Sequence, residues 1–216
     1  MIITKTPFRM SFFGGGTDME NFFVENGGAV LSTTFDKYCY VNVRHLPRFF
    51  DYSTELSYSK TERVTDIDAI QHPLIRNGMK MLDMHELRVT YEADLPARSG
   101  LGTSSSFAVG MLNAFYALKG KYADKKKLAD EAIYLERVLC NEAGGWQDQI
   151  AASFGGFNRI NFNADGYEVL PVIVSPERKR QLNKKLMMFF TGFTRFSSDF
   201  QKANNVSAKE KTAQLK

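Results

Sequence analysis

Hydroxyl side chains follow two closely spaced glycines in Gly100-Leu-Gly-Thr-Ser-Ser-Ser106. An apolar pattern at three- and four-residue spacing runs from Phe107 to Leu118, so a helix is predicted to begin at this turn. Unpaired N–H groups and the positive end of the helix dipole meet at such a helix start, and both attract anions. The segment therefore has the chemistry of a phosphate site, with hydroxyls suited to phosphate oxygens or Mg²⁺.

The same glycine turn also fits a plain capped helix, and the local pattern favours neither interpretation. No Gly-Lys-Ser/Thr follows the turn and no G-x-G-x-x-G is present, which excludes the two common nucleotide loops. Ser104 lacks a glycine two residues later, which excludes a nucleophile elbow. The turn alone thus indicates an anion site of unknown purpose or a structural cap.

Carboxylates stand at three other places where chemistry is possible. Asp18 follows the triple glycine Gly14–Gly16 at a predicted helix start, where it either caps the helix or binds substrate hydroxyls. Glu136 borders the apolar face of a helix predicted over 124–140, where it is either solvated or ion-paired, or able to reach a metal. Asp148 lies in the first turn of a short helix, a position that the helix dipole favours by itself.

The elements expected around these residues form an α+β pattern. A strand over 87–93 delivers the chain into the glycine turn, and 157–174 forms a hairpin that turns at 164–166. Residues 29–35 and 38–43 form a second hairpin, while Pro7 marks an edge or a break between two short strands in the extended segment 1–13. Residues 176–185 form a basic solvated link, 186–191 an apolar strand, and a capping box at 207–210 opens a further helix.

Composition bounds the class of protein. The 216 residues are 44% hydrophobic and include 18 phenylalanines, which is ample for a packed core. The net charge of +4 permits anionic ligands but is too mild to require nucleic acid. Cys39 and Cys140 read as reduced core residues, and the three histidines share no metal spacing. No membrane span or signal peptide is evident, so we expect a cytoplasmic protein.

Three segments, taken together, resemble the GHMP small-molecule kinases. Pro96-x-x-x-Gly-Leu-Gly-Thr-Ser-Ser-Ser106 is similar to the phosphate loop of that family. Pro7-Phe-Arg-Met-Ser-Phe-Phe-Gly-Gly-Gly-Thr-Asp18 is similar to its N-terminal motif, in the form typical of heptose 7-phosphate kinases. Gly145-Trp-Gln-Asp-Gln149 is similar to the segment that carries the catalytic aspartate in its sugar kinases.

The resemblance implies a role for each matching residue. Asp148 would act as general base or orienter of the acceptor hydroxyl, and Arg9 would stabilise charge on the transferred phosphoryl group. Ser104 and Glu136 would hold Mg²⁺. The sugar contacts would be Gly15, Gly16, Thr17, Asp18 and Asp148. The ATP phosphates would be bound by Gly100, Leu101, Gly102, Thr103, Ser104, Ser105 and Ser106.

The resemblance also implies a fold and a reaction. The fold is an α+β N-terminal domain (1–183) like a ribosomal protein S5 domain, with a left-handed βαβ crossover. The start of a ferredoxin-like domain would follow (184–216), and we expect the chain to be truncated there. The reaction is transfer of phosphate from ATP to the C1 hydroxyl of D-glycero-D-manno-heptose 7-phosphate, by a monomer or homodimer that binds neither nucleic acid nor membrane.

Other functions stay open at this stage. The acceptor is otherwise another sugar, such as fucose, galactose or mannose. The same fold also serves a non-catalytic nucleotide or sugar sensor, or an RNA-binding module, although scattered lysines disfavour the last. A phosphate on the sugar needs a basic partner, for which Arg44, Arg48 and Arg98 are candidates by charge alone.

Overall fold

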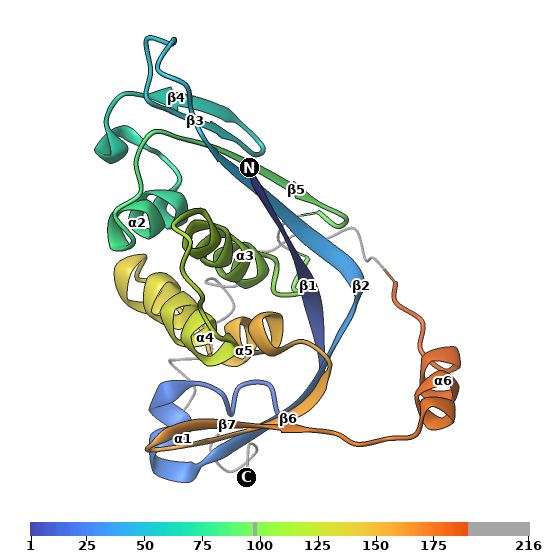
Figure 1. Ribbon diagram of the computed structural model, residues 1–216. Helices are drawn as coiled ribbons and strands as arrows, with labels where there is room; N and C mark the ends of the chain where they lie inside the picture. Colours follow the sequence, from blue (N-terminus) through green and yellow to red (C-terminus); the bar gives the residue numbers. More distant parts are fainter. Residues whose placement is uncertain (97–98, 190–216) are drawn as a thin grey trace.

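The computed structural model describes residues 1–96 and 99–189. A seven-stranded sheet runs the length of the molecule, and helices α2 to α5 lie against one of its faces (Figure 1). The strand order is β4-β3-β5-β2-β6-β7, with β1 paired to β2 outside this path. The expected α+β arrangement is therefore confirmed.

The longest strand, β2 (Gly28–His45), forms the spine of the sheet. On one side it pairs along most of its length with β1 (Ile2–Phe13). Its first half pairs with β6 (Phe157–Asn163) and its second half with β5 (Leu87–Ala93). β2 thus joins the β6 end of the sheet to the β5 end.

The prediction of a hairpin turning at Asp36-Lys37 was wrong. These two polar residues sit between the β6-paired and β5-paired halves of β2, where side chains are exposed and no turn is needed. Of the two interpretations of Pro7, the edge is confirmed and the break is not. β1 is an edge strand that continues through the proline with a register shift between Pro7 and Arg9.

The remaining strands extend the sheet at both ends. A hairpin of β3 (Thr54–Ser57) and β4 (Thr61–Val64) lies beyond β5, and β7 (Gly166–Pro171) lies beyond β6. β3 and β5 are parallel, so the chain must cross over between them. It does so through a short 3₁₀ turn (Ile67–Ala69) and α2 (Pro73–Met81).

The core lies between the sheet and α3 (Thr103–Leu118), the most buried helix. α4 (Lys125–Ile133) continues into a π-helical turn, Tyr134–Leu139, and α5 (Gln147–Phe154) packs beside both α3 and α4. A smaller apolar cluster joins α1 (Glu20–Asn26) to β6 and α5. α3 and α5 are thereby fixed against the same end of β1.

The segment after β7 differs from its prediction. Residues 176–185 were expected to be a link, yet α6 (Pro176–Lys184) is a helix capped by the Ser175 hydroxyl, although none of its residues is buried. Residues 186–189 are exposed and have no regular structure, so a strand is not formed there. The rest of that predicted strand, and the predicted helix at 207, lie outside the described residues.

Two smaller expectations concern cysteines and membranes. Cys39 is a free, fully buried core thiol, and Cys140 is free and half-buried, as predicted for reduced residues. Within the described ranges, every helix is too short or too polar to cross a bilayer.

Candidate active site

The first turn of α3 is open to a ligand. Its N-cap is Gly102, which adopts a left-handed conformation (φ 74°, ψ 30°), and no side chain caps the helix. The left-handed conformation favours glycine, and a Cβ on Gly102 would lie close to the functional pair, 3.2 Å from Arg9 Cγ and 3.5 Å from Asp148 Oδ2. The uncapped N–H groups of this turn can therefore donate hydrogen bonds to an anion that binds beside these two charged residues.

The hydroxyls of this turn divide into outward and inward groups. Ser104 is exposed and Thr103 is half-buried, so both can reach a ligand. Ser105 Oγ donates to Glu136 Oε2 (2.8 Å), and Ser106 Oγ donates to the Pro7 carbonyl (2.9 Å). Ser105 and Ser106 are buried and their hydroxyls are used internally. The Ser106 N–H also donates to the Gly102 carbonyl (2.9 Å), so of these two residues only Ser105 can offer a backbone N–H to the predicted phosphate cradle.

Arg9 and Asp148 form an ion pair at the mouth of this turn. Arg9 Nε donates to Asp148 Oδ1 at 2.7 Å, and a second guanidinium nitrogen lies 2.6 Å from the same oxygen. Arg9 also donates to the Gly100 carbonyl at 3.1 Å, and its backbone N–H donates to the Leu101 carbonyl at 3.2 Å. Arg9 thus ties the glycine turn to α5, while Asp148 keeps 24% of its side chain exposed.

Asp18 holds the loops on the other side of Asp148. Its carboxylate accepts hydrogen bonds from the N–H groups of Gly16 (3.0 Å) and Gln147 (3.1 Å) and is only 2% exposed. Burial raises the pKa of Asp18, the charge of Asp148 adds to the rise, and the two N–H donors oppose it. Asp18 does not cap α1, whose N-cap is Met19.

The neighbouring residues of the N-terminal motif are also mostly structural. The Thr17 hydroxyl lies within hydrogen-bond distance of the Gly14 carbonyl (2.8 Å) and of both backbone polar groups of Ala29. Thr17 is buried, so its hydroxyl fixes the turn rather than facing open space. Gly15 faces the Gln147 amide, whose nitrogen is 3.8 Å from a Cβ placed on that glycine.

Glu136 is placed by the π-helical turn that follows α4. It is only 1% exposed and accepts from Ser105 Oγ and from Gln149 Nε2 (2.5 Å). Burial raises the pKa of Glu136, while the charge of Arg137 and the hydroxyl and amide donors lower it. The alternative of a solvated or ion-paired Glu136 is therefore wrong, because no cationic side chain among the described residues bonds to it.

These surroundings fit the Mg²⁺ that the family implies. A buried carboxylate with an exposed serine hydroxyl nearby offers the hard oxygen ligands that Mg²⁺ takes, alongside phosphate oxygens and water. No group of three His, Cys, Asp or Glu side chains in the described ranges could hold a metal unaided. Ser104 and Glu136 thus fit a cation that arrives with a polyphosphate.

Several residues around the site were not singled out from the sequence. Arg137 donates to the carbonyls of Glu142, Ala143 and Gly145 (2.9–3.3 Å) and so clamps the loop that leads to Asp148. Ser11 donates to the Gln147 side chain at 2.5 Å. The Gly145–Gln149 motif marks the loop and helix start that these residues hold in place. Ser11 and Arg137 lie outside that motif, so the motif does not point to them.

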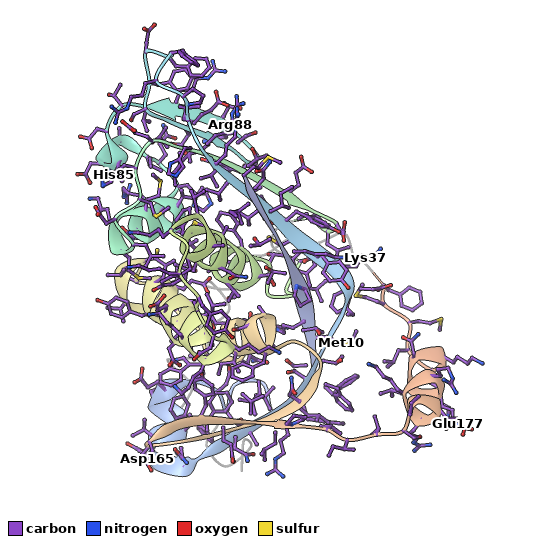
Figure 2. All side chains as sticks on the ribbon, in the orientation of Figure 1. Met10, Lys37, His85, Arg88, Asp165 and Glu177 are labelled. Carbon is purple, nitrogen blue, oxygen red and sulfur yellow. The ribbon has the colours of Figure 1, made fainter. Side chains whose placement is uncertain are left out.

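Two of the three basic residues considered for a sugar phosphate, Arg44 and Arg48, are not at this site. Arg44 faces Arg88 in the β2–β5 ladder and is ten positions from Thr34, the partner of Arg9, or about 30 Å along the strand. Figure 2 shows this separation through the labelled Arg88 and Met10. Arg48 pairs with Glu86. Arg98 lies outside the described residues.

The segment from before α2 to the end of α5 matches a known family model. Residues 69–156 match the family model of the GHMP kinases N terminal domain. This matched segment contains the glycine turn, Glu136 and Asp148 and resembles that domain.

The comparisons also show which proteins the chain resembles. A D-glycero-alpha-D-manno-heptose 7-phosphate kinase of Campylobacter jejuni is 31% identical over 93% of this chain and 62% of its own length. A bifunctional fucokinase/GDP-fucose pyrophosphorylase of Arabidopsis thaliana is 29% identical over 54% of this chain and 11% of its own length. This chain therefore spans less than two thirds of either relative.

A solved structure supports the fold. The crystal structure of a D-glycero-D-manno-heptose 1-phosphate kinase from Bacteroides thetaiotaomicron superimposes with a TM-score of 0.79 at 24% identity. The match covers 100% of this chain and 74% of that one. At this identity the likeness establishes the shared fold.

Proposed function

We propose that this chain binds ATP and a sugar and takes part in ATP-dependent phosphorylation of a sugar hydroxyl. The single observation that carries the proposal is the Arg9–Asp148 pair set against the uncapped first turn of α3. A helix N-terminus holds the phosphates, and a partly exposed carboxylate beside it faces the acceptor. The matching family model and the sugar-kinase relatives support the same activity.

Asp148 and Arg9 would divide the work of phosphoryl transfer. The acceptor oxygen forms a bond to the γ-phosphorus as the bond to the ADP oxygen breaks, and the hydroxyl proton passes to Asp148. Arg9 orients the Asp148 carboxylate, and its remaining N–H groups stabilise negative charge near the transferred group. The glycine turn, to which Arg9 is tied, aligns the two reactants.

Ser104 and Glu136 would hold Mg²⁺ on the nucleotide side of the site. The ion, when bound, neutralises charge on the transferring phosphate. The chain's own contribution is a rigid carboxylate that Ser105 and Gln149 hold in place. Thr103 and Ser104 then contact phosphate oxygens directly, and the buried Ser105 contributes its backbone N–H group.

We further propose D-glycero-D-manno-heptose 7-phosphate as the acceptor, with C1 as the phosphorylated position. The support is the N-terminal motif Arg9–Asp18 and the Campylobacter relative, which is named for heptose 7-phosphate. Fucose is the second candidate, because a fucokinase relative matches about half of the chain. The catalytic pair disfavours a sensor that only binds ligands, since such a protein needs no carboxylate beside the acceptor.

A coupled assay of ADP release tests both parts of the proposal. The protein is offered heptose 7-phosphate, fucose, galactose and mannose with Mg²⁺-ATP, and we expect turnover with heptose 7-phosphate to exceed the others at least tenfold. Asp148→Asn serves as the matched variant, because it keeps the side-chain volume and removes the base. It should bind ATP as the wild type does and lose most turnover.

The outcomes separate the alternatives. Turnover with fucose alone would retain the kinase and reject heptose as the acceptor. ATP binding without turnover of any sugar would point to the sensor. Full activity of Asp148→Asn would remove Asp148 from the mechanism, and salt-sensitive retention of RNA on a filter would favour the RNA-binding alternative.

A further inference from the structure

We propose that Gln149 is a positioning residue that orients Glu136 toward the divalent cation bound with the nucleotide. The inference rests on the proposed function, and it assigns a role that neither the family match nor the relatives supply. Gln149 lies directly after Asp148 in α5, so it would link the acceptor side of the site to the cation side.

The contact is made entirely inside the protein. Gln149 Nε2 donates to Glu136 Oε2 at 2.5 Å, and Ser105 Oγ donates to the same oxygen at 2.8 Å. Gln149 is 0% exposed, Glu136 1% and Ser105 3%. Two donors on one carboxylate oxygen fix the rotation of the group and leave its other oxygen, Oε1, for a ligand.

The amide of Gln149 is used at one end only. Its Oε1 is buried and has no hydrogen-bond partner among the described residues. The opposite amide orientation would place Oε1 against the Glu136 carboxylate, where two acceptors repel. The protein thus keeps an unpaired buried oxygen, which is unfavourable, in order to set a donor on Glu136.

The chain around Gln149 explains why this contact matters for the site. Asp148, whose side chain meets Arg9, and Gln149 are consecutive residues in the first turn of α5. Glu136 belongs to the π-helical turn, a geometry that often re-aims side chains at functional sites. A shift of α5 would therefore move the Asp148 carboxylate and the Glu136 carboxylate together.

Calorimetry without sugar tests the role apart from catalysis. ATP is titrated into each protein with Mg²⁺ and again with a chelator, and the ratio of the two affinities gives the Mg²⁺ enhancement. Gln149→Met keeps length and volume but cannot donate. We expect its enhancement to fall about tenfold, as for other residues that hold a metal ligand, with chelator affinity unchanged. Gln149→Asn, which is too short to reach Glu136, should show the same loss if Gln149→Met does not fold.

Two further variants show whether Gln149 acts through Glu136. Glu136→Gln should lower the enhancement, and adding Gln149→Met to it should cause no further loss. Asn158→Leu is the matched control, since Asn158 is a buried amide that donates to the Gly155 carbonyl (2.7 Å), just beyond the far end of α5. It should reduce stability and leave the enhancement unchanged.

Each outcome decides the matter. An unchanged enhancement in Gln149→Met, or additive losses in the double variant, would overturn the role of Gln149 and leave the proposed function intact. Equal losses with and without Mg²⁺ would show a merely structural residue. Absence of any Mg²⁺ enhancement in the wild type would instead count against the proposed nucleotide site itself.

Discussion

The carboxylate of Asp18 caps the helix that carries Asp148, because it accepts the backbone N–H of Gln147 at 3.1 Å across 129 positions of the chain. The N-cap residue of α5, Trp146, provides no side-chain cap, and its own N–H donates to the Asp18 carbonyl at 3.1 Å. An acidic side chain at this place also stabilises the positive end of the α5 dipole. Asp18 therefore helps to position Asp148 in the absence of any ligand.

The space occupied by Asp18 leads to the first prediction, which concerns Gly145. A Cβ on Gly145 would lie 1.9 Å from Asp18 Oδ2, so Gly145→Ala must displace either the carboxylate or the start of α5. We expect a loss of about 1–3 kcal/mol in the free energy of unfolding, the usual cost of overpacking, measured by urea denaturation.

Gly15→Ala is the matched control for Gly145→Ala. The nearest atom to a Cβ on Gly15 is 3.8 Å away, which is ordinary contact. Its unfolding free energy should change by less than about 0.5 kcal/mol. Equal stability of the two alanine variants would show that Asp18 does not depend on the space at Gly145.

The sequence predicted which residues carry the chemistry of the site better than it predicted the hydrogen bonds that hold them in place. The Gly100–Ser106 turn and its helix were predictable because glycine punctuation and apolar periodicity are local signals. The bond from Asp18 to Gln147 was not, because it joins segments more than a hundred positions apart. Ser105 and Ser106 look equivalent to Ser104 in sequence, and only packing shows that their hydroxyls point inward.

The errors in the fold have a similar cause. Asp36 and Lys37 read locally as a turn, but β1 and the two partners of β2 keep the strand continuous. α6 read as a link because its composition is basic and polar, yet a serine cap and Pro176 at its first position suffice to begin a helix. Neither feature depends on the apolar periodicity that located the other elements.

The second prediction concerns the Arg9–Asp148 pair, which should act as a unit. Arg9→Met removes both contacts to Asp148 Oδ1 and the bond to the Gly100 carbonyl. We expect Arg9→Met and Asp148→Asn each to lower kcat at least about a hundredfold, and the double variant to be no worse than the poorer single one. Steady-state kinetics with saturating ATP measures this. Multiplicative losses would show that the two residues act independently.

The third prediction concerns pH and His72, the N-cap residue of α2. His72 packs edge-on against Tyr58 and Phe107, with ring centroids 4.9 and 5.7 Å away. Burial lowers the pKa of His72, while the charge of Glu62 opposes the shift. The unfolded chain therefore binds a proton more readily than the folded protein. The contribution of neutral His72 to the free energy of unfolding is complete above the pKa of histidine in the unfolded chain, about 6.5. It is lost as pH falls below that pKa.

A variant that cannot titrate isolates the His72 effect. One proton changes the free energy of unfolding by at most about 1.4 kcal/mol per pH unit. His72→Phe should lose less stability than the wild type between about pH 7.5 and about pH 5.5, measured by urea denaturation at each pH. All other residues are the same in both proteins, so only the contribution of His72 differs between their pH profiles. Parallel pH profiles would exclude His72 as a source of the acid loss.

The fourth prediction uses the division of the serines on α3. Ser104 is exposed beside the buried Glu136, whereas Ser106 donates to the Pro7 carbonyl. Ser104→Ala should weaken binding of Mg²⁺-ATP about tenfold and leave sugar affinity within about twofold, because only the nucleotide side loses an oxygen ligand. Calorimetry with each ligand separates the two sites. Equal losses for both ligands would mean that the substitution disturbs the start of α3 rather than a cation contact.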